Sequence, residues 1–167
     1  MDNIYNDDDY IGLVQDILND EEFEKTKYSE HHGFSRFDHS MRVSYYSYKI
    51  AKKLKLSYIE TARAGLLHDF FLSDNRSCFK NKFLSNFRHA KEARDNSKKR
   101  FDISYKEEDI IITHMFPLNI VPPKYLESWI VTTVDKYVAT NEFFTLFRFR
   151  TKLATNLLVF FLINSLK

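Results

Sequence analysis

Histidine and aspartate residues recur along this 167-residue chain at positions where an apolar helical pattern predicts burial. They are His39, His68, Asp69, His89, His114 and Asp135. Burying an imidazole or a carboxylate without a partner is energetically costly. Five separate predicted helices supply these residues. Chance alone poorly explains why each of the five helices has such a residue at a buried position. Convergence on metal cations inside a helical bundle explains them better.

The types of these side chains narrow the kind of metal. Imidazole and carboxylate are ligands of Zn, Fe, Mn, Co and Ni, and the set contains no thiolate, which favours an open catalytic site over a closed structural zinc site. We therefore expect one or two divalent transition metals. Simpler alternatives exist for single residues. His89, between Arg88 and Lys91, could lie on the surface, and His114 could cap its own helix.

The elements that must position these residues are predicted to be helices. Ser35 and Asp38 have capping spacing and begin a helix to about Leu54, with His39 at the start of its apolar face. A second capping pair, Ser57 and Glu60, begins the helix that ends in the His68-Asp69 doublet. The other expected helices span residues 8–18, 88–99, 104 to about 116, 124–140 and 143–166. Residues 72–87 are expected to be a long connection. With no convincing strand pattern, the prediction is an all-α fold of about seven helices.

Length and composition fit a single domain over residues 1–167. The single cysteine, Cys78, fits a reducing compartment, and the acidic N-terminus is unlike a secretory signal, so we expect a cytoplasmic protein. The apolar stretch Leu153–Leu166 is shorter than the roughly 20 residues that span a bilayer. On this ground no membrane partner is expected.

Charge is distributed unevenly. Residues 1–30 contain ten Asp and Glu against two Lys and Arg, whereas residues 31–167 contain 13 against 23. A basic body suits an anionic ligand such as a phosphate ester, although a solvated lysine-rich surface gives the same pattern. Nucleic acid is not an expected partner, because no aromatic-basic stripe or helix-turn-helix signature is present.

Three short motifs resemble a known family. FDHSMRV at residues 37–43, LLHD at 66–69 and VDK at 134–136 are similar to the HD-domain superfamily of metal-dependent phosphohydrolases, and closest to its small standalone bacterial proteins. The family pattern is a histidine, a His-Asp doublet and a distal aspartate, all on helices. The resemblance covers about residues 28–140. We expect the acidic N-terminal helix and the apolar C-terminal helix to pack on this core.

The resemblance implies two sets of metal ligands. The first set is His39, His68, Asp69 and Asp135. The second set, as in binuclear members, is His89, His114 and a bridging Asp69. The implied reaction is attack of metal-activated water on phosphorus, with Asp69 as the shared carboxylate.

Protein cations are expected to hold the substrate phosphate. Arg42, one helical turn after His39, is the best candidate, followed by Lys136 and Arg36. His32 lies in a loop and could protonate a leaving group. These residues predict a phosphomonoesterase or phosphodiesterase that acts on a small phosphorylated molecule such as a nucleotide.

Other functions fit the same residues. Some HD-fold proteins are di-iron oxygenases with four histidines and two aspartates, a ligand count that this sequence also offers. A metal-stabilised module that binds a nucleotide without turnover is a non-enzymatic alternative. The two terminal helices could also serve a homodimer.

Overall fold

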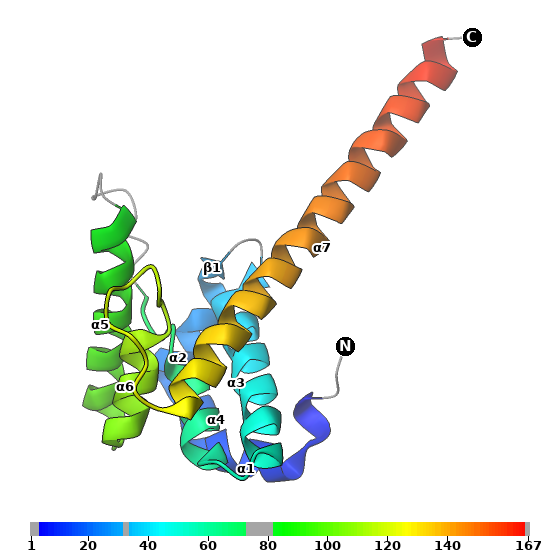
Figure 1. The fold of residues 1–167 in the computed structure, drawn as a ribbon. Coiled ribbons are helices and arrows are strands. Elements are labelled where there is room, and N and C mark those ends of the chain that lie inside the picture. Colours follow the sequence, from blue (N-terminus) through cyan, green and yellow to red (C-terminus); the bar gives the residue numbers. More distant parts are fainter. Residues whose placement is uncertain (1–3, 32–33, 73–81, 166–167) are drawn as a thin grey trace.

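Helices make up nearly all of the structure, a computed structural model that describes residues 4–31, 34–72 and 82–165 (Figure 1). The α-helices within these residues are α1 (Asp8–Leu18), α2 (Glu21–Glu24), α3 (Arg36–Lys53), α4 (Tyr58–Leu67), α5 (Lys82–Arg100), α6 (Tyr105–Thr113) and α7 (Leu126–Ser165). Two short 3-10 helices, η1 (Ile4–Asn6) and η2 (Lys25–Tyr28), and two two-residue antiparallel strands, β1 (Glu30–His31) and β2 (Phe34–Ser35), complete the set. The all-α prediction is confirmed.

Helix α3 lies at the centre of the bundle, where it packs against α4 and α7. Its N-terminus is fixed as predicted, because the Ser35 hydroxyl accepts a hydrogen bond from the Asp38 N–H. Helix α1 packs on α4 and buries Tyr10, Val14 and Ile17 completely. Helix α6 begins with a full capping box between Ser104 and Glu107.

The contact between α3 and α4 depends on a glycine. A Cβ added at Gly65 in α4 would lie 2.9 Å from the Ser44 Cα in α3, closer than carbon atoms can pack. The Gly65 carbonyl also accepts a hydrogen bond from the His68 ring. Gly65 therefore sets the separation of the two helices that carry His39 and His68.

We expect Gly65→Ala to destabilise the fold by about 1–3 kcal/mol, because the neighbour is backbone and cannot move aside cheaply. Chemical denaturation measures this loss. The matched control is Gly12→Ala in α1, where no atom lies within 4 Å of the added Cβ. That variant should gain about 0.5–1 kcal/mol from helix propensity. Equal stability of the two variants would contradict the assigned packing.

Several local predictions differ from the structure. Helix α2 was not expected, and it forms because the Asp20 side chain caps it by accepting from the N–H groups of Glu22 and Phe23. Ser57 precedes α4 without a side-chain capping bond, and its own N–H donates to Glu127 instead. Helix α5 starts at Lys82, inside the expected connection.

The largest difference concerns the C-terminal helix. A break was expected near residues 141–142, but α7 runs without interruption from Leu126 to Ser165. The sequence contains no glycine or proline between Ala139 and Phe143 that could end the helix. The helix therefore continues straight and projects away from the other helices (Figure 1). Its second half, residues 143–165, therefore does not fold back onto the core as expected. We call these residues the α7 tail.

The length and hydropathy of the helices decide whether any of them could span a membrane. Within the described residues, no helix combines the length and the apolar character needed to cross a bilayer.

Candidate metal centre

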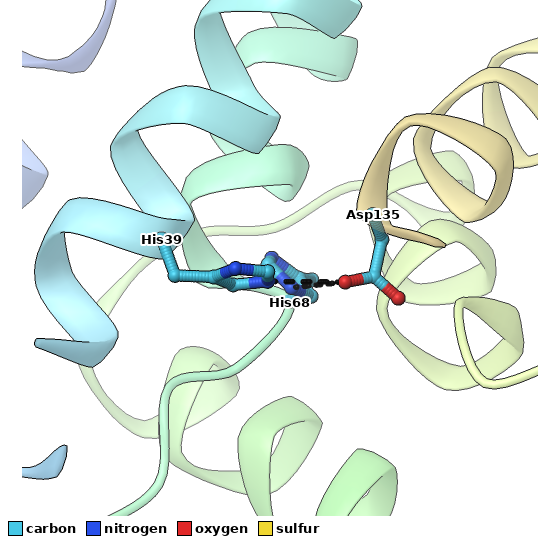
Figure 2. A group of neighbouring side chains, drawn as sticks. All are labelled: His39, His68 and Asp135. Atoms are coloured by element: carbon cyan, nitrogen blue, oxygen red, sulfur yellow. Dashed lines mark hydrogen bonds and ion pairs between the residues drawn. The ribbon is translucent and has the colours of Figure 1, made fainter. Parts of the chain in front are cut away.

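Three side chains from three helices meet in the interior. His39 lies in the first turns of α3, His68 directly follows α4, and Asp135 belongs to α7. Their ligand atoms all lie within 4.8 Å of one another. The His39 Nε2 is 3.1 Å and the His68 Nε2 3.6 Å from the same atom, the Asp135 Oδ1 (Figure 2). Both imidazoles and the carboxylate thus point at a common spot.

His68 and His114 occupy equivalent positions, each one residue beyond a helix end. Each ring donates from Nδ1 to the carbonyl three residues earlier, at 2.8 Å to Gly65 O and 2.6 Å to Ile111 O. These bonds satisfy carbonyls that a helix end leaves without a partner. They also place the proton on Nδ1, so that each Nε2 presents its lone pair to the interior.

The Nε2 atoms of His68 and His114 are the clearest indication of a cation site. Both are buried and have no hydrogen-bond partner among the described residues. A buried polar atom without a partner is costly, and two of them beside carboxylates are the arrangement that a cation would complete. The donor set of imidazole nitrogens and carboxylate oxygens fits a divalent transition metal.

Asp69 lies between these two histidines. Its Oδ1 is 3.5 Å from the His114 Nε2 and its Oδ2 is 4.0 Å from the His68 Nε2. The carboxylate is only 6% exposed. Its two oxygens therefore face two different imidazoles.

His39 is held at both ring nitrogens by the same helix. Asp135 contacts Nε2, and Glu142, two turns later on the same face of α7, lies 2.9 Å from Nδ1 through its Oε2. Glu142 is 3% exposed, and its Oε1 accepts a 2.7 Å bond from the Arg42 Nη1. Glu142 thus orients His39, while Arg42 neutralises Glu142.

Sequence reasoning missed Glu142 because a helix break was expected beside it. The available signal was its spacing, since a residue seven positions after Asp135 shares its helix face.

Comparison with known proteins settles the family. The model of the HD domain matches residues 36–140, more than half of the chain. The chain belongs to the HD-domain family. No curated protein and no solved structure matches it. The predicted resemblance is therefore confirmed, and with it membership of a superfamily whose members are generally metal-dependent hydrolases. Glu142 lies just outside the matched residues.

The charges of this HD-domain site are strongly coupled. Burial lowers the pKa of His39, but its hydrogen bonds to Asp135 and Glu142 outweigh burial and raise the pKa to about 10. Burial raises the pKa of Asp135, but the hydrogen bond with His39 and the nearby imidazoles of His68 and His114 hold that pKa well below its ordinary value. Burial lowers the pKa of His114, but the nearby Asp69 carboxylate outweighs burial, and the pKa is raised above its ordinary value. In the metal-free chain, an incoming metal must therefore displace protons.

This coupling predicts how the metal-free HD domain responds to pH. A histidine pKa raised from 6.5 to about 10 on folding adds stability that is complete below pH 6.5 and is lost as pH rises through about 10. The melting temperature of chelator-treated protein should therefore fall as pH rises across this window. The His39→Gln variant serves as the reference, because it lacks this titration. Parallel curves for the two proteins would refute the prediction.

The remaining predicted metal ligand, His89, belongs to α5. Its ring packs edge-on against Phe71, with the centroids 4.1 Å apart, and it is not part of the group formed by His39, His68 and Asp135. Phe71 follows the His68-Asp69 doublet by two residues, so His89 contacts the segment that leaves the site. Its role as a ligand stays a prediction.

The predicted phosphate-binding cations are placed differently from one another. Arg36 is fully buried, stacks on Phe71 with its guanidinium carbon 3.7 Å from the ring centre, and donates to the Phe71 carbonyl. It braces the segment after the doublet, whereas the sequence predicted it as a cation for the substrate phosphate. The Arg42 side chain is 26% exposed, and it also lies over the Phe34 ring.

Lys136 is also engaged by the protein. Its Nζ donates to the carbonyls of His114 and Thr132, at 2.9 and 3.2 Å. Burial lowers its pKa, an effect that the neighbouring Asp135 partly offsets. Lys136 therefore ties α7 to the end of α6, where His114 lies. His32 falls outside the described residues.

Proposed function

We propose that this HD-domain protein is a metal-dependent phosphohydrolase that acts on a small phosphorylated molecule. The observation that carries the proposal is the pair of buried Nε2 atoms on His68 and His114, which have no hydrogen-bond partner among the described residues and lie beside Asp69 and Asp135. The general character of the family supports hydrolysis as the reaction class.

The proposed ligands form two overlapping sets. His39, His68, Asp69 and Asp135 would hold a first metal, and Asp69 would share a second with His114 and His89. A divalent metal bound here supplies Lewis-acid activation of water near neutral pH and offsets negative charge on a phosphate. Fe, Mn, Zn, Co and Ni all suit this set of imidazole and carboxylate donors.

The chain's own residues prepare the site for this chemistry. Gly65, Ile111 and Glu142 each accept the Nδ1 proton of one histidine, so that all three Nε2 atoms face inward. Packing excludes water from His39, His68 and His114, each 1% exposed or less. This exclusion strengthens every electrostatic interaction inside the site.

Arg42 is the cation that we propose for the substrate phosphate. Its bond to Glu142 uses Nη1, and a guanidinium has further N–H donors for phosphate oxygens. Lys136 is proposed to act mainly through its hold on the His114 carbonyl. Arg36 is not included, because its guanidinium is buried against Phe71.

A nucleotide is the proposed substrate class, and a reducing cytoplasm the proposed compartment. The basic balance of residues 31–167 supports an anionic substrate, and the single Cys78 supports the compartment.

The direct test is hydrolysis by metal-loaded protein. Purified chain is loaded separately with Mn, Co, Ni, Zn or Fe and assayed against an aryl phosphate, an aryl phosphodiester and a nucleotide panel, with metal content measured in parallel. We expect phosphate release that chelator abolishes and metal restores. Inert protein with full metal content would refute the proposal, and oxygen consumption by the iron-loaded form would favour the oxygenase alternative.

A further inference from the structure

The α7 tail exposes large apolar side chains to solvent. Its exposed residues include Phe143, Phe144, Phe147, Phe149, Leu153 and Leu157, whose side chains are between 49% and 65% exposed. The tail projects from the bundle as a straight helix (Figure 1), and its 23 residues correspond to about 34 Å. An apolar helix of this length standing alone in water calls for a surface that covers it.

Four of the exposed apolar residues of the tail share one side of the helix, and Phe144 and Phe149 flank that side. At 100° per residue, Phe143, Phe147, Leu153 and Leu157 fall within one third of the helix circumference. Arg148 and Lys152 fall on the opposite side. Arg150 lies within the apolar face, where a long side chain can bury its stem and keep its charge in a polar layer.

The charge of the tail has one sign. Residues 143–165 contain Arg148, Arg150 and Lys152 and no Asp or Glu. Two tails paired in parallel would bring six cations together without any acidic residue from the tails to offset them. A partner that is both apolar and negatively charged fits this composition better than a second copy does.

The threonines of the tail are compatible with an apolar surrounding. The hydroxyls of Thr145, Thr151 and Thr155 each donate to the carbonyl four residues earlier in the same helix. Their hydrogen-bond donors are therefore satisfied inside the helix and do not need water.

We propose that the α7 tail binds the surface of an anionic lipid bilayer, lying in the interface without crossing it. Exposed Phe and Leu side chains combined with Lys and Arg, and without acidic residues, are typical of helices that lie in this position. The expectation of no membrane partner rested on the length needed to span a bilayer, which an interfacial helix does not need. This proposal is independent of the catalytic function.

The test uses the full chain with vesicles of two compositions, phosphatidylcholine alone and phosphatidylcholine mixed with phosphatidylglycerol, in a sedimentation assay. We expect binding to the mixed vesicles only, weakened by added salt. The triple variant R148A/R150A/K152A should bind about 100-fold more weakly, since each basic residue near an anionic surface contributes about a factor of five. The variant F147S/L157S should also lose binding.

Matched controls separate the tail from general charge. The variant K53A/K91A/K99A removes three exposed lysines from α3 and α5, and it should bind like the unmodified chain. Circular dichroism and metal content establish that each variant is folded. Absence of binding to the mixed vesicles, or equal loss in both triple variants, would overturn the proposal. So would a stable dimer in analytical ultracentrifugation that F147S/L157S dissociates, because the tail would then cover a second copy.

Discussion

Replacing Asp69 by alanine is expected to lower the turnover of phosphate esters by about a thousand-fold. Asp69 offers one oxygen to the side of His114 and the other to the side of His68, so its loss removes a carboxylate from both proposed metal positions. Stabilisation of charge by a metal contributes several kcal/mol to such a reaction, and each 1.4 kcal/mol is about a factor of ten in rate.

The Asp69→Ala experiment needs turnover and metal content measured on the same samples. Asp69→Asn keeps the shape of the side chain and removes its charge, so it should lose nearly as much activity as Asp69→Ala. Asp102→Ala removes an exposed carboxylate outside the site and should leave both quantities unchanged. If Asp69→Ala retained full turnover, the assignment of the whole site would fall.

Replacing Glu142 by alanine is expected to weaken metal binding about 10- to 100-fold, which is the usual effect of removing a group that orients a histidine ligand. Glu142 accepts the Nδ1 proton of His39 and thereby turns its Nε2 toward Asp135. Without Glu142, the His39 ring loses this restraint and Arg42 loses its buried counter-charge.

Competition with a chelator measures the metal affinity of the Glu142 variants. Glu142→Gln retains an oxygen acceptor for the Nδ1 proton and should recover part of the affinity. Nitrogen NMR of the His39 ring reports its tautomer directly, and that signal should change in Glu142→Ala. Glu21→Ala, which removes an exposed carboxylate on α2, is the control. An unchanged affinity together with an unchanged ring signal would show that Glu142 does not act on His39.

The two predictions concern different kinds of residue. Asp69 would contact the metals directly, whereas Glu142 acts through His39. Loss of activity in the Asp69 variants with unchanged metal affinity in the Glu142 variants would therefore leave the proposed function standing and remove only the positioning role.

The sequence by itself determined the bundle and most of the polar residues that meet inside it. Capping residues such as Ser35 and Ser104 mark helix starts through short-range hydrogen bonds, and such bonds depend on only a few neighbouring residues. Burial of His39 and Asp135 follows from helical periodicity in the same local way. The cost of burying polar groups then made their convergence predictable.

Only the tertiary structure decided the arrangement around these residues. The absence of glycine and proline permits α7 to continue through residues 141–142, but only the structure shows that this continuity places Glu142 on His39 and carries the α7 tail away from the core. The sequence predicts Arg36 as a cation that holds the substrate phosphate, yet packing against Phe71 buries it. Such outcomes depend on contacts between residues distant along the chain, and no local pattern encodes those contacts.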